Sequence, residues 1–236
     1  MKGSSAARWS LAALVVVVAL IVAIWPRSSA GDQGPGNFAD YRDTFGTAPS
    51  DDVPESELAP MRTQADLQPC PEPQDDTAPN DTAPNDTAPN DTALSGPLAG
   101  VRTTCMADGS SVDLGAALAG RPTVLNLWAY WCQPCAEELP YLQQYADRAA
   151  GAVTVLTVHS DPQQGNALAR LSDYGVRLPG VQDASSSVAA AIGAPPVLPV
   201  TVMIGADGSV SQVLPQPFRS VDEIAAAVDR YLGVTT

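Results

Sequence analysis

Residues 125–140 read LNLWAYWCQPCAEELP, an apolar run followed by an aromatic turn, two cysteines two residues apart and a segment with helical periodicity. If the apolar run is a buried strand and a helix begins at the cysteines, Cys132 lies where free backbone N–H groups and the helix dipole stabilise an anion. In such motifs the thiol pKa falls to about 3.5 to 7.5, against about 8.5 for a free cysteine. The sequence therefore predicts that Cys132 is a nucleophilic thiolate at neutral pH.

The second cysteine of the motif, Cys135, follows one helical turn later and is expected to be more buried. In that position it can attack a mixed disulfide formed by Cys132 and release the bound thiol. Pro134 suits the first turn of a helix, which does not need its missing N–H donor. The motif thus predicts a redox couple, and we expect no metal and no other cofactor. A four-thiolate zinc site that recruits Cys70 and Cys105, or an inert structural disulfide, remains an alternative.

From Val101 onward the sequence alternates short apolar runs with amphipathic stretches, which is typical of an α/β domain. Asp207 and Gly208 form a hairpin signal between the last two runs, so the sheet is expected to be mixed. The expected strands span residues 123–129, 153–159, 200–204 and 210–214. The expected helices span residues 134–149, 164–174, 185–192 and 220–232.

Three quoted segments together carry a family resemblance: WCQPC after LNLWAY, the downstream VLPVTVMIGADG, and MADGSSVDLGAALAGRPTVLNLW before the motif. With them the chain resembles the thioredoxin superfamily, and specifically the membrane-anchored TlpA/ResA group, over residues 97–232. The resemblance implies a three-layer thioredoxin-like fold with a mixed central sheet. It also implies that Pro199 is a cis-proline facing the disulfide and that Leu198 offers backbone groups to an extended substrate.

Other positions match or depart from that family pattern. Trp131 is expected to shield the cysteine pair and to form part of the docking surface. Gln133 occupies a position where ResA-type reductases carry a glutamate, and its uncharged amide cannot act as a base. Glu138 matches the glutamate of the group's CxxCxxExP pattern and is a candidate for proton handling or for compensation of the helix dipole. His159, the one histidine of the chain, is expected to be a partly buried histidine with satisfied hydrogen bonds.

The N-terminal part of the chain predicts a membrane anchor and a stem. Residues 9–25 form an uncharged apolar run with a tryptophan at each end, nearly long enough to span a bilayer, and positive charge precedes it. We therefore expect residues 1–30 to be a single-pass anchor with a cytoplasmic N-terminus, residues 31–96 to be a disordered stem containing a DTAPN repeat, and residues 97–236 to be an extracytoplasmic domain. A short helix at residues 55–67 is a weaker expectation within the stem.

The remaining cysteines, Cys70 and Cys105, flank the repeat. In an oxidising compartment two such cysteines most simply pair with each other, so we expect a structural disulfide that folds the repeat into a closed loop.

These features together predict a thiol-disulfide oxidoreductase that exchanges disulfides with protein substrates outside the cytoplasm. The resemblance favours reduction, in cytochrome c maturation, with a membrane electron donor or acceptor for thiols as redox partner. The formal charge of −14 makes nucleic acid an unfavourable partner. Two alternatives stay open: an oxidase of the same fold that forms disulfides, and a copper-handling protein that uses Cys132, Cys135 and His159.

Overall fold

A computed structural model describes residues 53–73 and 96–236. In that part of the chain the backbone forms a seven-stranded sheet in the order β2-β1-β5-β4-β3-β6-β7. The strands are β1 (Arg102–Cys105), β2 (Ser111–Asp113), β3 (Thr123–Trp128), β4 (Thr154–His159), β5 (Gly180–Gln182), β6 (Val200–Ile204) and β7 (Val210–Leu214).

The sheet is mixed, as expected. Strands β3, β4 and β5 run parallel, and the other neighbouring pairs are antiparallel. The four strands expected from apolar runs are present, with bounds that agree within one residue. The three-residue strand β5 was not expected, because the sequence around Gly180 offers neither a long apolar run nor clear alternation. The lead-in hairpin implied by the family resemblance is β1 and β2, paired from Arg102 to Asp113 and from Thr104 to Ser111.

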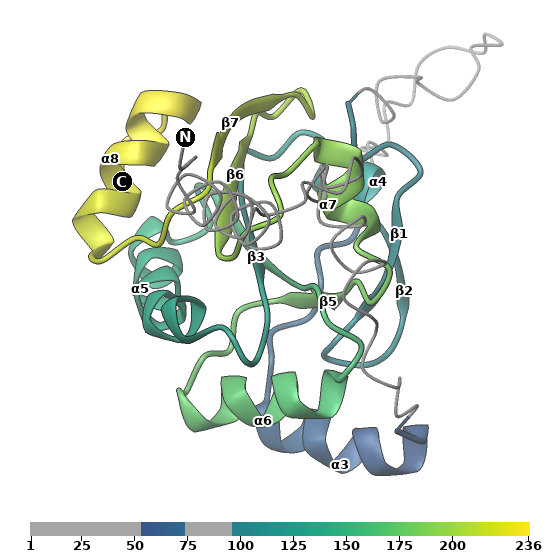
Figure 1. Cartoon of the computed structure of the whole chain (residues 1–236). Coiled ribbons are helices and arrows are strands. Elements are labelled where there is room, and N and C mark those ends of the chain that lie inside the picture. Colours follow the sequence, from purple (N-terminus) through teal and green to yellow (C-terminus); the bar gives the residue numbers. More distant parts are fainter. Residues whose placement is uncertain (1–52, 74–95) are drawn as a thin grey trace, which may run out of the picture. The chain divides into compact units, whose positions relative to one another are not determined.

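Helices cover both faces of the sheet, which gives the three layers expected from the resemblance (Figure 1). On one face lie α5, α6 and α8, and on the other lie the short helices α4 and α7. Their bounds are α4 (Leu114–Leu118), α5 (Gln133–Ala149), α6 (Gln164–Asp173), α7 (Ser187–Ile192) and α8 (Val221–Leu232).

Alternation along β3 divides the core between the two faces. Val124 and Trp128 pack with the cluster that contains α5, whereas Leu125 and Leu127 pack with the cluster that contains α4 and α7. All six residues of β3 are buried, as a strand covered on both faces requires. The carboxyl end of this central strand leads directly into the cysteine motif.

The short helix expected at residues 55–67 of the stem is present as α3 (Glu55–Ala65), two residues shorter than expected. Helix α3 packs against α6, and the two lie side by side in Figure 1. Leu58 and Ala65 are buried in the same core cluster as α5, and this burial offsets the entropy of ordering the segment. Only a few residues of α3 form its packing face.

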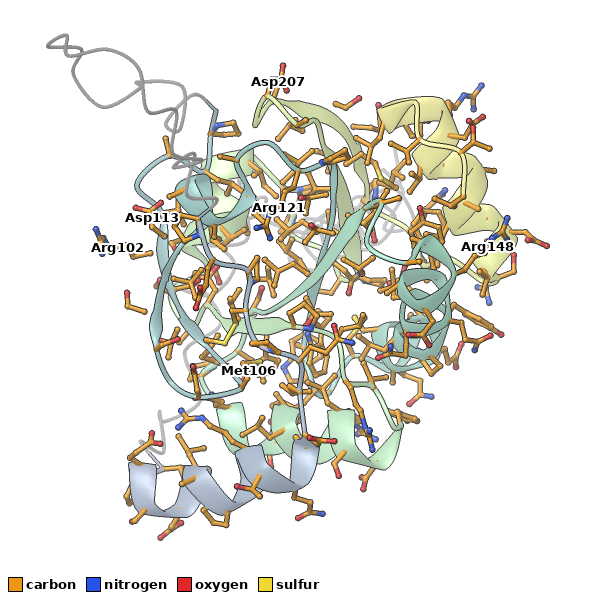
Figure 2. All side chains as sticks on the ribbon, turned by 180° about the vertical axis from the view of Figure 1, so that it is seen from behind. Arg102, Met106, Asp113, Arg121, Arg148 and Asp207 are labelled. Atoms are coloured by element: carbon orange, nitrogen blue, oxygen red, sulfur yellow. A yellow bond between two sulfur atoms is a disulfide. The ribbon has the colours of Figure 1, made fainter. Side chains whose placement is uncertain are left out.

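The end of this ordered segment is joined to the sheet by a disulfide between Cys70 and Cys105, the last residue of β1. Met106 follows in the buried interior, whereas Arg102 and Asp113 lie on the outer β1–β2 edge (Figure 2). The residues from Cys70 to Cys105 thus form a closed loop that contains the DTAPN repeat, and the repeat itself lies outside the described residues.

The expected membrane anchor at residues 9–25 also lies outside the described residues. Within residues 53–73 and 96–236, none of the helices has the length and apolar character needed to cross a membrane.

Candidate active site

A tight turn connects β3 to α5 and delivers Cys132 to the start of the helix. The N–H of Cys132 donates to the carbonyl of Ala129 at 3.0 Å, which closes a β-turn with Tyr130 and Trp131 at its centre. Cys132 is the N-cap residue of α5, and its Sγ accepts a hydrogen bond from the N–H of Cys135 at 3.3 Å. The sulfur therefore lies where the unpaired N–H groups and the dipole of α5 stabilise negative charge.

The two cysteines of the motif form a disulfide, with Sγ atoms 2.06 Å apart. Cys132 is 5% exposed and Cys135 is 0% exposed. An incoming thiol or disulfide can therefore reach Cys132 first, which is the asymmetry expected from the sequence for an attacking and a resolving thiol.

The peptide bond between Leu198 and Pro199 is cis. Pro199 is buried and immediately precedes β6, where Val200 pairs with Leu127 of β3. Leu198 packs against the core cluster that contains Cys132 and Cys135. The cis-proline segment thus lies at the carboxyl end of β3, beside the turn that carries the cysteines, as the family resemblance implies.

Several residues around the motif are exposed to solvent. Trp131 is 56% exposed, and its indole Nε1–H donates to Asp161 Oδ2 at 3.0 Å. Gln133 and Pro134 are exposed within the first turn of α5, and the amide of Gln133 donates to Glu137 at 3.4 Å. Val197, next to Leu198, is 47% exposed.

Glu138 points into the protein, and its side chain is fully buried. Its Oε2 accepts from Asn126 Nδ2 at 3.0 Å, and its Oε1 accepts from the N–H of Phe218 at 2.9 Å. Burial raises the pKa of this carboxyl from 4.5 to about 7, although the hydrogen bonds oppose the shift. Glu138 therefore does not lie at the surface, and its carboxyl titrates near neutral pH.

Asn126 and Thr201 complete the surroundings of this carboxyl. They are register partners on β3 and β6, and Asn126 Nδ2 donates to both Thr201 Oγ1 and Glu138 Oε2 at 3.0 Å. The carbonyl Oδ1 of Asn126 is buried with no hydrogen-bond partner. That unpaired acceptor can serve a protonated Glu138 if the amide of Asn126 turns over.

His159 ends β4 beside the active-site turn and is fully buried rather than partly buried. Its Nε2 lies 3.3 Å from the N–H of Tyr130, and its Nδ1 lies 2.9 Å from Gln182 Oε1. Burial lowers the pKa of His159 to about 4. Because Tyr130 and Gln182 face the two ring nitrogens, both nitrogens have hydrogen-bond partners. This confirms the expectation of a histidine with satisfied hydrogen bonds.

We find no group of three or more His, Cys, Asp or Glu side chains placed to hold a metal ion within residues 53–73 and 96–236. The copper alternative needs His159 as a third ligand to Cys132 and Cys135, but the two ring nitrogens of His159 already bind protein groups.

Several residues of the site were not expected from the sequence. They come from separate strand ends and loops, namely Thr201, Phe218, Asp161 and Gln182. One signal could have identified Asp161: polar residues that follow a buried parallel strand collect at the carboxyl edge of the sheet. No comparable signal marks Phe218, whose contribution is a backbone N–H.

The chain is similar to several known thiol-disulfide oxidoreductases. A family model described as Redoxin matches residues 75–228. Thiol-disulfide oxidoreductase ResA of Bacillus subtilis (strain 168) is 32% identical over 108 residues, which cover 45% of this chain and 59% of that protein. The match thus extends over less than two thirds of this relative.

Two solved structures cover the domain more fully. A secreted Mycobacterium tuberculosis disulfide oxidoreductase, described as homologous to E. coli DsbE, is 28% identical with a TM-score of 0.50. MTB DsbF, solved in mixed oxidised and reduced forms, is 26% identical with a TM-score of 0.52. Each comparison covers 57% of this chain and 97% of the solved chain.

Proposed function

The chain belongs to the Redoxin family, and from that premise we propose that it is a thiol-disulfide oxidoreductase that reduces disulfides of protein substrates through Cys132 and Cys135. The observation that carries the proposal is the place of Cys132 at the N-cap of α5, where its sulfur accepts a hydrogen bond from the N–H of Cys135 and Cys132 is more exposed than the fully buried Cys135. The relatives named above, one of which carries the same activity in its name, support the reaction type.

In the first step, the Cys132 thiolate attacks one sulfur of a substrate disulfide. The Cys132–substrate S–S bond forms, the substrate S–S bond breaks, and the leaving thiolate takes a proton. The N-terminus of α5 supports this step because it favours the thiolate of Cys132 over the thiol.

In the second step, Cys135 loses its proton and attacks Cys132 Sγ. The bond between Cys132 and the substrate breaks, the Cys132–Cys135 disulfide forms, and the substrate leaves with its second thiol. Two electrons pass from the cysteine pair to the substrate. Glu138 is the group that receives the Cys135 proton in this proposal, since it lies three residues further on the buried face of α5 and titrates near neutral pH.

The substrate is proposed to bind as an extended segment across the exposed surface beside the pair. Trp131 supplies apolar contact area, and Leu198, before the cis-proline Pro199, supplies backbone hydrogen-bonding groups. Gln133 and Pro134 complete the exposed rim of the motif. Recognition through backbone groups suits protein substrates of varied sequence.

The direction and setting of the reaction are further parts of the proposal. We place the domain outside the cytoplasm, held to the membrane by residues 9–25, where Cys70 and Cys105 can remain oxidised. A membrane thiol donor would re-reduce Cys132 and Cys135. The resemblance to the TlpA/ResA group supports reduction in the service of cytochrome c maturation.

The reduction potential of the pair tests the direction. We expect a value near about −270 mV, at the reducing end of the range for such pairs. The full chain would be equilibrated with defined thiol buffers, and the state of each cysteine read by thiol labelling and mass. A value near about −120 mV would instead identify a disulfide-forming oxidase. A Cys132→Ser variant, in which the couple cannot form, is the control for Cys70 and Cys105.

A further inference from the structure

The turn that carries Cys132 is held from the neighbouring strands by a closed set of hydrogen bonds. Trp128 of β3, His159 of β4 and Gln182 of β5 are register partners at the carboxyl ends of three parallel strands. Their side chains therefore stand in one row on the same face of the sheet. The rings of Trp128 and His159 are 5.0 Å apart between centroids.

The side-chain polar atoms of His159 and Gln182 each have one partner that fits, whereas Trp128 Nε1 is buried without a hydrogen-bond partner. His159 Nε2 faces the N–H of Tyr130, so this nitrogen must be the acceptor and carry no proton. A neutral imidazole must then carry its proton on Nδ1, which faces Gln182 Oε1 at 2.9 Å. The amide orientation of Gln182 is fixed in turn, because its Nε2–H donates to the carbonyl of Asp161. A single tautomer and a single amide orientation satisfy all these bonds.

These hydrogen bonds extend to Tyr130 and Trp131, the two central residues of the active-site turn. His159 binds the backbone N–H of Tyr130, and Asp161, whose carbonyl is held by Gln182, binds the indole of Trp131. The next residue is Cys132, whose own N–H closes the turn. A change at Gln182 would therefore release the turn at two points without touching the cysteine pair.

We infer that Gln182 and His159 are positioning residues for the thiol-disulfide reaction: they hold the turn at residues 129–132 so that the Cys132 sulfur stays at the N-terminus of α5. This inference rests on the proposed function. It adds a positioning residue, Gln182, on β5, two strands away from β3. The mechanism follows from geometry, because the thiolate is stabilised only while its sulfur lies against the free N–H groups of the helix.

The hydrogen bonds also predict how the set responds to protonation. A proton on Nε2 of His159 would face the Tyr130 N–H, so two donors would oppose each other and the turn would be released. Three uncharged residues face the imidazole of His159, namely Trp128, Tyr130 and Gln182. Asp161 is the charged group that favours protonation of His159. Arg170, whose Nε–H donates to the carbonyl of Tyr130, holds the turn from α6 and carries the opposing charge.

The test compares Gln182→Ala and Gln182→Glu with Gln212→Ala and Gln212→Glu in the full chain. Gln212 lies on β7, is half-buried and donates to the carbonyl of Val213, so it provides a matched glutamine in the same sheet. For Gln182→Ala we expect a higher pKa of the Cys132 thiol and a three- to tenfold larger equilibrium constant for oxidation of the pair by glutathione. That range corresponds to a potential more negative by roughly 15 to 30 mV. The Gln212 variants should match the unsubstituted chain.

The single histidine of the chain gives a second readout, and its tautomer can be measured without any variant. Nitrogen NMR of the unsubstituted chain should show His159 neutral, with its proton on Nδ1. Gln182→Glu places a carboxylate against the ring, so the pKa of His159 should rise and the Cys132 thiol pKa should change as His159 titrates.

A proton found on Nε2 in the unsubstituted chain would overturn the inference, as would an unchanged thiol pKa and equilibrium constant in a folded Gln182→Ala. If Gln182→Ala does not fold, the tautomer and the Gln182→Glu titration decide the inference. Failure of the proposed function has a different signature, because the unsubstituted pair would then not exchange with glutathione or protein disulfides at all.

Discussion

Replacing the buried carboxyl of Glu138 by the amide of glutamine should make the stability of the protein less dependent on pH. The pKa of Glu138 is raised by burial from 4.5 to about 7. Below pH 4.5 the group is protonated in both the folded and the unfolded states and contributes nothing to the pH dependence. As the pH rises through this interval the unfolded chain loses the proton first, so the free energy of unfolding decreases.

The magnitude follows from the size of the shift. The shift in the pKa of Glu138 from 4.5 to about 7 corresponds to roughly 3 kcal/mol of unfolding free energy. This decrease in the free energy of unfolding is complete above pH 7. Glu138→Gln stays neutral throughout, so its stability relative to the unsubstituted chain should improve by up to about 3 kcal/mol between pH 4 and pH 9. Loss of the carboxylate bonds to Asn126 and the N–H of Phe218 adds an offset that does not vary with pH.

The assay is denaturant unfolding of the oxidised full chain at a series of pH values, followed by circular dichroism. Keeping both disulfides intact removes the cysteine titrations from the comparison. Glu137→Gln is the control, because Glu137 is the neighbouring residue on α5 and is exposed. Its stability should follow that of the unsubstituted chain within about 0.5 kcal/mol. A stability difference for Glu138→Gln that stays constant from pH 4 to pH 9 would refute the raised pKa.

Three further outcomes are expected. Cys135→Ser should accumulate a mixed disulfide between Cys132 and protein substrates, visible by mass, whereas Cys132→Ser should form none; equal trapping by both variants would reverse the assigned roles. Replacing Cys70 and Cys105 together by serine should lower the free energy of unfolding by about 3 to 4 kcal/mol, the loop-entropy value for a separation of 35 residues, and an unchanged denaturation midpoint would contradict this. Leu58→Ala should cost about 2 to 3 kcal/mol and speed hydrogen exchange in α3 and α6; unaltered exchange in α6 would show that α3 does not stabilise that helix.

Much of the domain could be predicted from local sequence. The apolar runs at residues 200–204 and 210–214 became β6 and β7 with the expected bounds, and helix α5 began within one residue of its expected start. These elements are long or strongly patterned, so the period of their apolar residues is sufficient. The three-residue strand β5 carries too few residues for a period, and its pairing with β1 and β4 defines it.

Helix α3 was expected at residues 55–67 and is present, but its packing partner could not be predicted from the sequence. Helix α3 has a weak apolar pattern, and its helical state depends on contacts of Leu58 and Ala65 with a distant part of the chain. Composition averaged over a long window reports the polar majority of residues and not the few that pack.

The sequence by itself determined the position of the cysteine pair: two cysteines two residues apart at the start of a helix can form a disulfide at the helix N-terminus, because spacing and the helix N-terminus are local properties. Tertiary structure decided the environment of that pair. The pKa of Glu138 depends on burial among Asn126, Thr201 and Phe218, which come from three other parts of the chain. The orientation of the Cys132 turn depends on His159, and hence on Gln182 from β5. Desolvation and cross-strand hydrogen bonds are set by residues far apart in sequence, so they arise only when the sheet has assembled.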